Sequence, residues 1–125
     1  MATAERTGRR KLRLNSADWD ILEAVADGRR YTQQHLYDDV ESLESHSADW
    51  IRQRVSHLRD NGLLQKVGTS AMYEISNEGI AALQLREEAG GEIETGVEFA
   101  KAVYKRAEDV DREAWIQERM FGDCS

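Results

Sequence analysis

Apolar residues recur at helical spacing in three segments of the first half of the chain, and this spacing predicts three short helices. The first helix begins at a cap on Ser16 and stops at Gly28, and the second begins at Thr32. Ser47 caps the third helix, which ends at Asn61-Gly62, where the chain needs the left-handed conformation that these residues tolerate. The side chains that these helices turn inward are Trp19, Ile21, Leu22, Val25, Ala26, Leu36, Val40, Ile51, Val55 and Leu58.

The apolar pattern then changes from the period of a helix to that of a strand. Residues 63–67 and 71–75 are short extended stretches, joined by Gly68-Thr69-Ser70, which predicts a β-hairpin. Ser76 caps a fourth helix, and Gly90-Gly91 forms a hinge after it. The inward residues of this helix are Ile80, Ala82 and Leu83.

A wide apolar stripe follows the hinge and predicts one long amphipathic helix. Its members are Ile93, Val97, Ala100, Val103, Tyr104, Ala107, Val110 and Ala114. Asp111 is placed to cap a short terminal helix that carries Trp115. The stripe either folds back on its own chain or pairs with a second chain, and its width favours a helical dimer layer over a coiled-coil seam. The expected dimerisation residues are Val97, Ala100, Val103, Tyr104, Ala107 and Val110.

Three helices, a hairpin and a fourth helix predict a mainly α-helical fold with a small β-hairpin wing, in the α+β class. This order is typical of the winged helix-turn-helix. We expect a basic N-terminal arm over 1–13, a winged-helix domain over 14–89 and a C-terminal helical dimerisation segment over 92–121.

Four sequence pieces resemble archaeal winged-helix regulators. They are Asp20-Ile21-Leu22-Glu23, SADWIRQR at 47–54, LRDNGLL at 58–64 and YEISNEG at 73–79. The chain is most similar, over about residues 14–85, to the haloarchaeal family of the phage phiH repressor. The resemblance implies a DNA-binding transcriptional regulator. The turn between the second and third helices is a few residues longer than is usual in these proteins, which affects the angle expected between them.

The charge of the chain is acidic and unevenly distributed. There are 17 Lys and Arg against 24 Asp and Glu, a formal net charge of −7, which by itself disfavours binding to phosphates. Residues 1–13 carry +4, whereas 14–85 carry −6 and 86–125 carry −5. An acidic body with basic spots is compatible with DNA binding. Thirteen of the 17 basic residues are Arg, and a surface poor in Lys and rich in Asp and Glu indicates a halophilic source.

The third helix is the candidate recognition helix, because turning its apolar stripe inward leaves a polar face outward. Gln53 matches N6 and N7 of adenine, and Arg52 matches O6 and N7 of guanine. Asp49 can accept from cytosine, although its place in the first turn also suits the helix dipole. Taken alone, these residues are typical of a solvated helix face, and the surrounding fold pattern favours recognition. The expected DNA-contacting residues of this helix are Ser47, Asp49, Arg52, Gln53, Arg54, Ser56 and His57.

Other segments are candidate contacts to the DNA backbone. In the wing these are Lys66, Thr69 and Ser70, a basic side chain and two hydroxyls suited to phosphate oxygens. Thr32 and Gln33 begin the second helix, where amides can receive a phosphate. Arg9 and Arg10 belong either to a minor-groove arm or to a tail that only aids solubility.

Catalysis, cofactors and metals have no motif in this sequence. It has no nucleophile elbow and no phosphate-binding glycine loop, and its single Cys and three scattered His predict no metal site. No apolar run approaches the roughly 18 residues of a membrane span, and the basic N-terminus has no secretory pattern, so we expect a cytoplasmic protein. We therefore predict a sequence-specific double-stranded DNA-binding regulator, a homodimeric repressor and not an enzyme. The alternatives are a winged-helix protein–protein adaptor that does not bind DNA and an enzyme-associated regulatory subunit.

Overall fold

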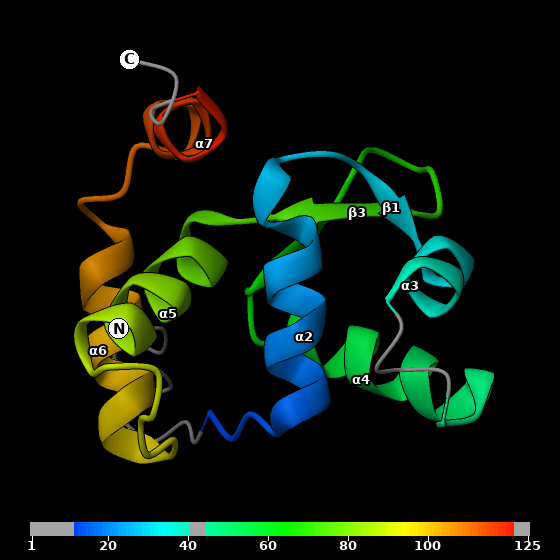
Figure 1. Ribbon diagram of the computed structural model, residues 1–125, viewed down its shortest axis with the longest axis horizontal. Helices are drawn as coiled ribbons and strands as arrows, with labels where there is room; N and C mark the ends of the chain where they lie inside the picture. Colours follow the sequence, from blue (N-terminus) through cyan, green and yellow to red (C-terminus); the bar gives the residue numbers. More distant parts are fainter. Residues whose placement is uncertain (1–11, 41–44, 122–125) are drawn as a thin grey trace.

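Helices surround a small antiparallel sheet in the computed structural model, which describes residues 12–40 and 45–121 (Figure 1). The helices are α2 (Ser16–Ala24), α3 (Gln33–Asp39), α4 (Ala48–Asp60), α5 (Asn77–Glu88), α6 (Val97–Ala107) and α7 (Arg112–Phe121). The strands are β1 (Tyr31–Thr32), β2 (Leu64–Lys66) and β3 (Met72–Ile75), and a 3₁₀ turn, η1 (Val25–Asp27), extends α2. The described part is thus mainly helical with a three-stranded antiparallel sheet, which confirms the α+β class.

Side-chain caps set the start of each of the first four helices. Thr32, Ser47 and Ser76 cap α3, α4 and α5 as predicted, each hydroxyl accepting from the amide three residues on. The predicted cap on Ser16 is wrong by one residue, because Asn15 caps α2. The side chain of Asn15 accepts from the amide of Asp18, and the carboxylate of Asp18 accepts from the amide of Asn15. This reciprocal capping box satisfies two backbone donors, whereas Ser16 would satisfy only one.

The sheet has the order β1-β3-β2, and both pairs are antiparallel. The hairpin of β2 and β3 was predicted, and Leu64 lies opposite Ile75 in it. Strand β1, in which Tyr31 lies opposite Tyr73, was not predicted from the sequence. Two residues are too few to show the period of a strand, and this pairing joins segments about 40 residues apart. The hydroxyl of Tyr31 also donates to Asp27 at 2.7 Å, which fixes the approach to the strand.

One hydrophobic core joins the helices and the sheet, and every inward residue predicted for the first, third and fourth helices is buried in it. The second helix buries Leu36 fully and Val40 in part. Trp19 of α2 meets Phe99 of α6 edge to face at 5.9 Å between ring centroids. Arg86 of α5 lies over the ring of Trp19, with its guanidinium carbon 4.9 Å from the ring centroid.

The long helix expected after the hinge is shorter than predicted, because α6 ends at Ala107 and the residues from Arg112 onward belong to the separate terminal helix α7. Gly96, at φ +146°, precedes α6, and α6 ends at Ala107 before the turn that leads to α7. Asp111 caps α7 as predicted, since its carboxylate accepts from the amide of Ala114 at 3.2 Å. The apolar residues before and after the turn therefore lie on two separate helices and cannot form one continuous face.

The face expected for dimerisation is packed inside the chain. Ala100 and Val103 are fully buried, and Ala107 is 8% exposed, because α6 lies against α5 (Figure 1). Val97 and Val110 are half-buried, and the hydroxyl of half-buried Tyr104 donates to the carbonyl of Asn61 at 2.7 Å. The structure therefore follows the alternative in which the stripe folds back on its own chain. These six residues offer no exposed contact face to a second copy.

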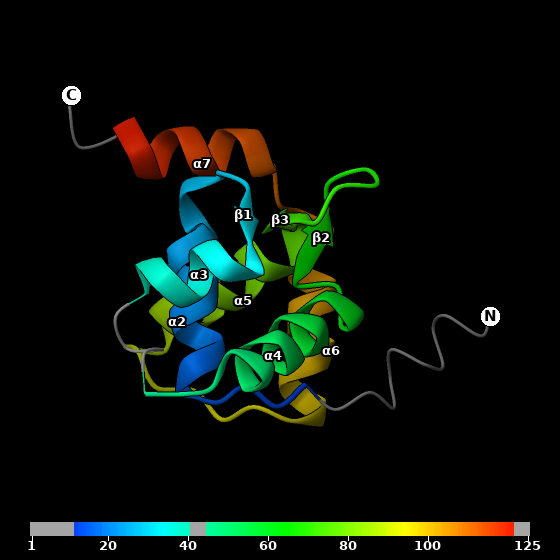
Figure 2. The ribbon, with the colours of Figure 1, turned by 90° about the vertical axis from the view of Figure 1, so that its right-hand side faces the viewer.

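Helix α7 lies across the end of α2 and beside the sheet, as the two views of the ribbon show (Figures 1 and 2). Ile116 sits on Gly28, where a Cβ atom would come within 2.7 Å of the Ile116 side chain. Arg112 donates to the carbonyl of Ile75 at 2.8 Å, and Arg119 pairs with Glu23 at 3.0 Å. The last helix is thus attached to both the sheet and α2.

The boundary predicted at residue 13 falls inside the folded part. Leu12 is fully buried, and its amide donates to the carbonyl of Gly96 at 3.0 Å. Most of the expected basic arm, including Arg9 and Arg10, lies outside the described residues. None of the helices in the described ranges has the length and apolar character that crossing a bilayer requires.

Candidate nucleic-acid interface

Helix α4 has one buried face and one exposed face, as its sequence predicted. The buried face is made by Ile51, Val55 and Leu58, none more than 1% exposed. On the opposite side, Arg52 and Gln53 are exposed to solvent. The apolar stripe at i, i+4 and i+7 therefore fixes which way the helix is turned.

The exposed face of α4 carries one loose ion pair. Arg52 donates to Asp49 at 3.2 Å, one helical turn away, and the two side chains are 63% and 81% exposed. Exposed pairs of this kind contribute between about 0 and 1 kcal/mol. Because the pair is so weak, the guanidinium of Arg52 can exchange Asp49 for a phosphate or a guanine at little cost. The same contact gives Asp49 a partner besides the helix dipole.

Arg54, an expected DNA contact, lies off this exposed face and is engaged within the chain. Its guanidinium forms two hydrogen bonds to the carboxylate of Asp18 in α2, one of them at 2.8 Å. The arginine side chain is 22% exposed and Asp18 is fully buried. Hydrogen bonding to Asp18 raises the pKa of the Arg54 guanidinium above its ordinary value, against the opposing effect of burial. The guanidinium of Arg54 therefore joins α4 to α2.

The remaining expected contacts of α4 are partly engaged within the chain. Ser47 uses its hydroxyl to cap the helix, accepting from the amide of Trp50 at 3.1 Å. Ser56 and His57 are half-buried. Nε2 of His57 lies 3.2 Å from the carbonyl oxygen of Arg13, which holds the ring against the start of the folded chain. Direct contact by these residues with a groove is therefore less accessible than contact by Gln53.

Trp50, at the start of α4, is half-buried. Its ring stacks on that of His46, with 4.0 Å between centroids and 24° between planes. The stack extends the N-terminal end of α4 back into the preceding loop. One face of the indole is thereby covered by an imidazole and is not a platform for a nucleic-acid base.

The β2–β3 hairpin follows α4 in the chain and projects away from it, and its turn is exposed (Figure 2). Lys66, Thr69 and Ser70 are all exposed, as a contacting wing requires. The hydroxyl of Ser70 also shapes the turn, donating to the carbonyl of Val67 at 2.6 Å and accepting from the amide of Met72 at 3.3 Å. Ser70 therefore shapes the turn, whereas Lys66 and Thr69 are the side chains of the hairpin that lie open to solvent.

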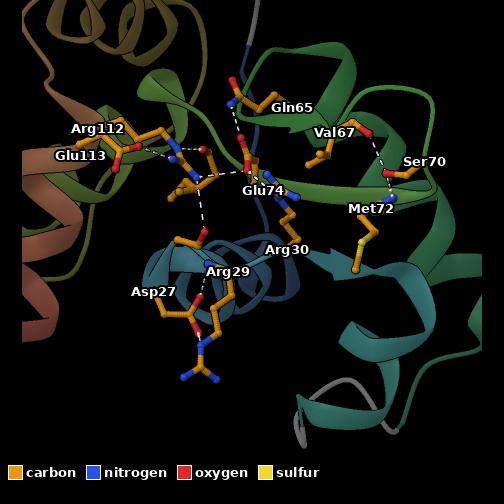
Figure 3. A network of polar contacts seen from close by, with 12 residues as sticks. Asp27, Arg29, Arg30, Gln65, Val67, Ser70, Met72, Glu74, Arg112 and Glu113 are labelled. Atoms are coloured by element: carbon orange, nitrogen blue, oxygen red, sulfur yellow. Dashed lines mark hydrogen bonds and ion pairs between the residues drawn. The ribbon is translucent and has the colours of Figure 1, made fainter.

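The base of the hairpin is braced by the carboxylate of Glu74 (Figure 3). Gln65 on the neighbouring strand donates to it at 2.7 Å, and Arg112 of α7 approaches it to 3.5 Å. Arg30 comes within 3.7 Å of the same carboxylate, and Arg29 within 3.8 Å of Asp27. Two arginines ahead of β1 are therefore balanced by carboxylates.

Helices α3 and α4 enclose a shallow hollow of about 170 Å³ that the sequence analysis did not predict. Its lining residues are Gln33, Gln34, Tyr37, Ala48 and Arg52. Gln33 and Arg52 were expected contacts, and the structure brings them together. Tyr37 was missed, although its place four residues after Gln33 puts both on one side of a helix. Thr32 is engaged, since its hydroxyl accepts from the amide of His35 at 3.0 Å, leaving that amide no hydrogen to offer a phosphate.

Positive and negative charges are nearly matched over the described part of this face. Arg52 pairs with Asp49, and Arg59 with Asp60 at 3.0 Å. Lys66, on the hairpin, is a further exposed cation. The candidate interface consists of this polar face of α4, the hollow against α3 and the hairpin turn. In comparisons with known proteins, no family model, no curated protein and no solved structure matches this chain.

Proposed function

We propose that this protein is a sequence-specific double-stranded DNA-binding transcriptional regulator, built as a winged helix-turn-helix. In this proposal α4 is the recognition helix, α3 crosses the DNA backbone and the β2–β3 hairpin is the wing. The observation that supports it most is the exposed polar face of α4, with Arg52 and Gln53 outward, followed in the chain by a hairpin with an exposed turn. The proposal places the chain with archaeal regulators similar to the phage phiH repressor.

Base recognition would rest on two neighbouring side chains of α4. The amide of Gln53 can pair with N6 and N7 of adenine, and the guanidinium of Arg52 with O6 and N7 of guanine. Lys66 and Thr69 of the hairpin suit phosphate oxygens, which fix register and carry no sequence information. Gln33 and Gln34 line the hollow next to Arg52 and can supply further polar contacts to the backbone.

Repression by a homodimer in the cytoplasm of a salt-adapted cell remains part of the proposal. The contact surface between copies must lie elsewhere than on the face that α6 packs against α5. Analytical ultracentrifugation at working concentration tests the oligomeric state. A dimer is expected. If the protein is a monomer and still binds its selected site, two copies do not bind a symmetric operator together.

A protein–protein adaptor is the second candidate, and the charge of the chain favours it. The net charge is −7, and two of the exposed cations of α4, Arg52 and Arg59, already have carboxylate partners. An acidic surface of this kind repels a polyanion at long range. An adaptor with this fold would retain no duplex DNA of any sequence.

Selection of bound fragments from random duplex DNA distinguishes the two candidates. The enriched duplex is then titrated by fluorescence anisotropy with wild type, Arg52→Ala and Gln53→Ala. Each substitution is expected to weaken binding by about 10- to 100-fold, because a bidentate base contact contributes about 1–3 kcal/mol. Lys105→Ala and Gln117→Ala, exposed on α6 and α7, are the matched controls. Failure to enrich any duplex, or unchanged binding by both α4 variants, would overturn the proposal.

Salt dependence gives a second measurement on the same duplex. The described face exposes three cations, Arg52, Arg59 and Lys66. Since each neutralised phosphate adds about 0.9 to the slope of log affinity against log salt, these three cations account for a slope of about 3 in magnitude, to which an N-terminal arm that contacts DNA would add. The acidic body of the protein can take up cations on contact and flatten the slope further. A slope near that of a strongly basic binder would contradict this picture of the interface.

A further inference from the structure

The carboxylate of Asp18 is a fully buried charge with three hydrogen-bond donors around it. One donor is the amide of Asn15, at 2.9 Å within the capping box of α2. The other two are Nε of Arg54, at 2.8 Å, and Nη2 of the same guanidinium. Within the described part of the chain, no buried side-chain nitrogen or oxygen atom lacks a hydrogen-bond partner. The site is therefore satisfied only while α4 keeps Arg54 in place.

This contact fixes more than the distance between the two helices. A planar fork that donates twice to one carboxylate restricts both the separation and the mutual rotation of the groups it joins. Removing one partner from such a pair leaves a buried charge without compensation, so alternative packings of α4 are disfavoured. Arg54 directly follows Gln53 in the chain. A restraint on Arg54 therefore acts on the part of α4 that also carries the outward side chains.

We propose that the Asp18–Arg54 pair is a positioning device that sets the rotation of α4 on α2, and so aims Arg52 and Gln53 at the major groove. This inference rests on the proposed function. A helix with its side chains is about 10–12 Å across, so a rotation of about 20° moves a side-chain tip by roughly 2 Å. Hydrogen-bond distances span only about 0.5 Å, so such a rotation removes bidentate base contacts. Flexible side chains can still reach the DNA phosphates after such a rotation, so nonspecific binding is retained.

Two other roles of Arg54 make opposite predictions. If Arg54 instead contacts a phosphate, removing Asp18 releases the guanidinium to the DNA and removes a negative charge, and both changes tighten binding. If the pair only stabilises the fold, its loss lowers specific and nonspecific binding together, in proportion to the folded fraction. The positioning role alone lowers specific affinity while nonspecific affinity and salt slope stay the same.

Asp18→Asn is the first test, because asparagine keeps the shape and an acceptor for the amide of Asn15. We expect binding to the selected duplex to weaken about tenfold, with affinity for a scrambled duplex and the salt slope unchanged. Glu23→Gln is the matched control: it removes the same charge from the same helix, at a side chain that is 42% exposed. Its binding should equal that of wild type or be slightly tighter. Circular dichroism at the assay temperature establishes that each variant is folded.

Arg54→Lys and Arg54→Met complete the test and guard against a variant that fails to fold. Lysine keeps the charge but cannot form the fork, so Arg54→Lys should lose specific affinity about as Asp18→Asn does. Because the pair acts as a unit, the double variant of Asp18→Asn with Arg54→Met should lose no more than either single change. If the double variant instead loses as much specific binding free energy as the two single variants together, the pair does not act as a unit.

Three outcomes overturn the proposal. If Asp18→Asn or Arg54→Lys binds the selected duplex as tightly as wild type does, the pair has no positioning role, while the proposed function stands. A salt slope reduced by about 1 in Arg54→Met, with specific and scrambled duplexes weakened alike, assigns Arg54 to a phosphate instead. A wild-type protein that retains no duplex at any salt concentration overturns both the proposed function and the inference built on it.

Discussion

Gly79, in the first turn of α5, is predicted to reject the smallest side chain. A Cβ atom built on it would lie 2.3 Å from the carbonyl oxygen of Leu63 and 2.8 Å from Cγ1 of Ile75. The first neighbour is backbone and cannot rotate away. The α5 terminus is also bound to this backbone, since the amide of Ser76 donates to the carbonyl of Leu63 at 3.3 Å. Alanine at position 79 must therefore move α5 away from the start of the hairpin.

Whether Gly79→Ala raises or lowers the free energy of unfolding distinguishes this close contact from ordinary helix propensity. Replacing glycine by alanine in an unobstructed helix stabilises by up to about 1 kcal/mol. Forcing a methyl group into a packed site destabilises by about 1–3 kcal/mol. Weakening the Ser76 amide bond to Leu63 removes about 1 kcal/mol more. We expect Gly79→Ala to lower the free energy of unfolding by about 2 kcal/mol.

Denaturant unfolding followed by far-ultraviolet circular dichroism measures this change at 25 °C. Gly68→Ala is the control, because Gly68 has φ +58° and nothing lies within 4 Å of its Cβ position. It should lose only the cost of a left-handed alanine, about 1–2 kcal/mol. If the denaturant concentration at the midpoint of unfolding is the same for Gly79→Ala as for wild type, or higher, α5 does not approach Leu63 this closely.

Three further changes test contacts of the C-terminal helices. The hydrogen bond from Arg106 lowers the pKa of Glu88 below its ordinary 4.5, so ionised Glu88 stabilises above that pH and the effect disappears as pH falls through the folded value. Thermal melts of Glu88→Gln should therefore lie below wild type at pH 7 and converge with it once the pH falls below the folded pKa of Glu88; equal melts at pH 7 would contradict this. Tyr104→Phe removes the bond to the carbonyl of Asn61 and should lower the free energy of unfolding by about 1 kcal/mol in denaturant titrations, and no change would show that the bond adds nothing. Arg112→Ala deletes donors to backbone carbonyls at 2.8 and 3.5 Å, so we expect a loss of about 2 kcal/mol and faster proteolysis within α7. Proteolysis at the wild-type rate would show that α7 is held by other contacts.

Local signals in the sequence were sufficient for most of the helices and the hairpin. Caps on Thr32, Ser47 and Ser76 were predicted correctly, because capping depends on neighbours within three residues. The buried stripe of α4 followed from its spacing, and with it the outward position of Gln53. The cap of α2 was misplaced to Ser16 because two adjacent polar residues both suit that role.

The role of Arg54 could not be predicted from its neighbours in the sequence. Its position on the helix wheel, beside the outward face, is compatible with either a groove or a partner helix. The deciding group is the carboxylate of Asp18, which lies 36 residues earlier and is buried only when α2 packs on α4. In the sequence alone, Asp18 is one of several acidic residues in a first turn. The same limit applies to β1, whose two residues become a strand only by pairing with β3.

The sequence by itself determined the local elements: where helices begin, which side chains they turn inward and where the hairpin turns. These depend on backbone conformation and on periodicity, which are short-range properties. The tertiary structure decided which polar side chains remain available. It directed Arg54 to Asp18 and packed the stripe of α6 against α5, leaving Arg52 and Gln53 exposed. The partners of apolar faces and buried charges come from segments that are distant in the sequence, so they cannot be identified from neighbouring residues.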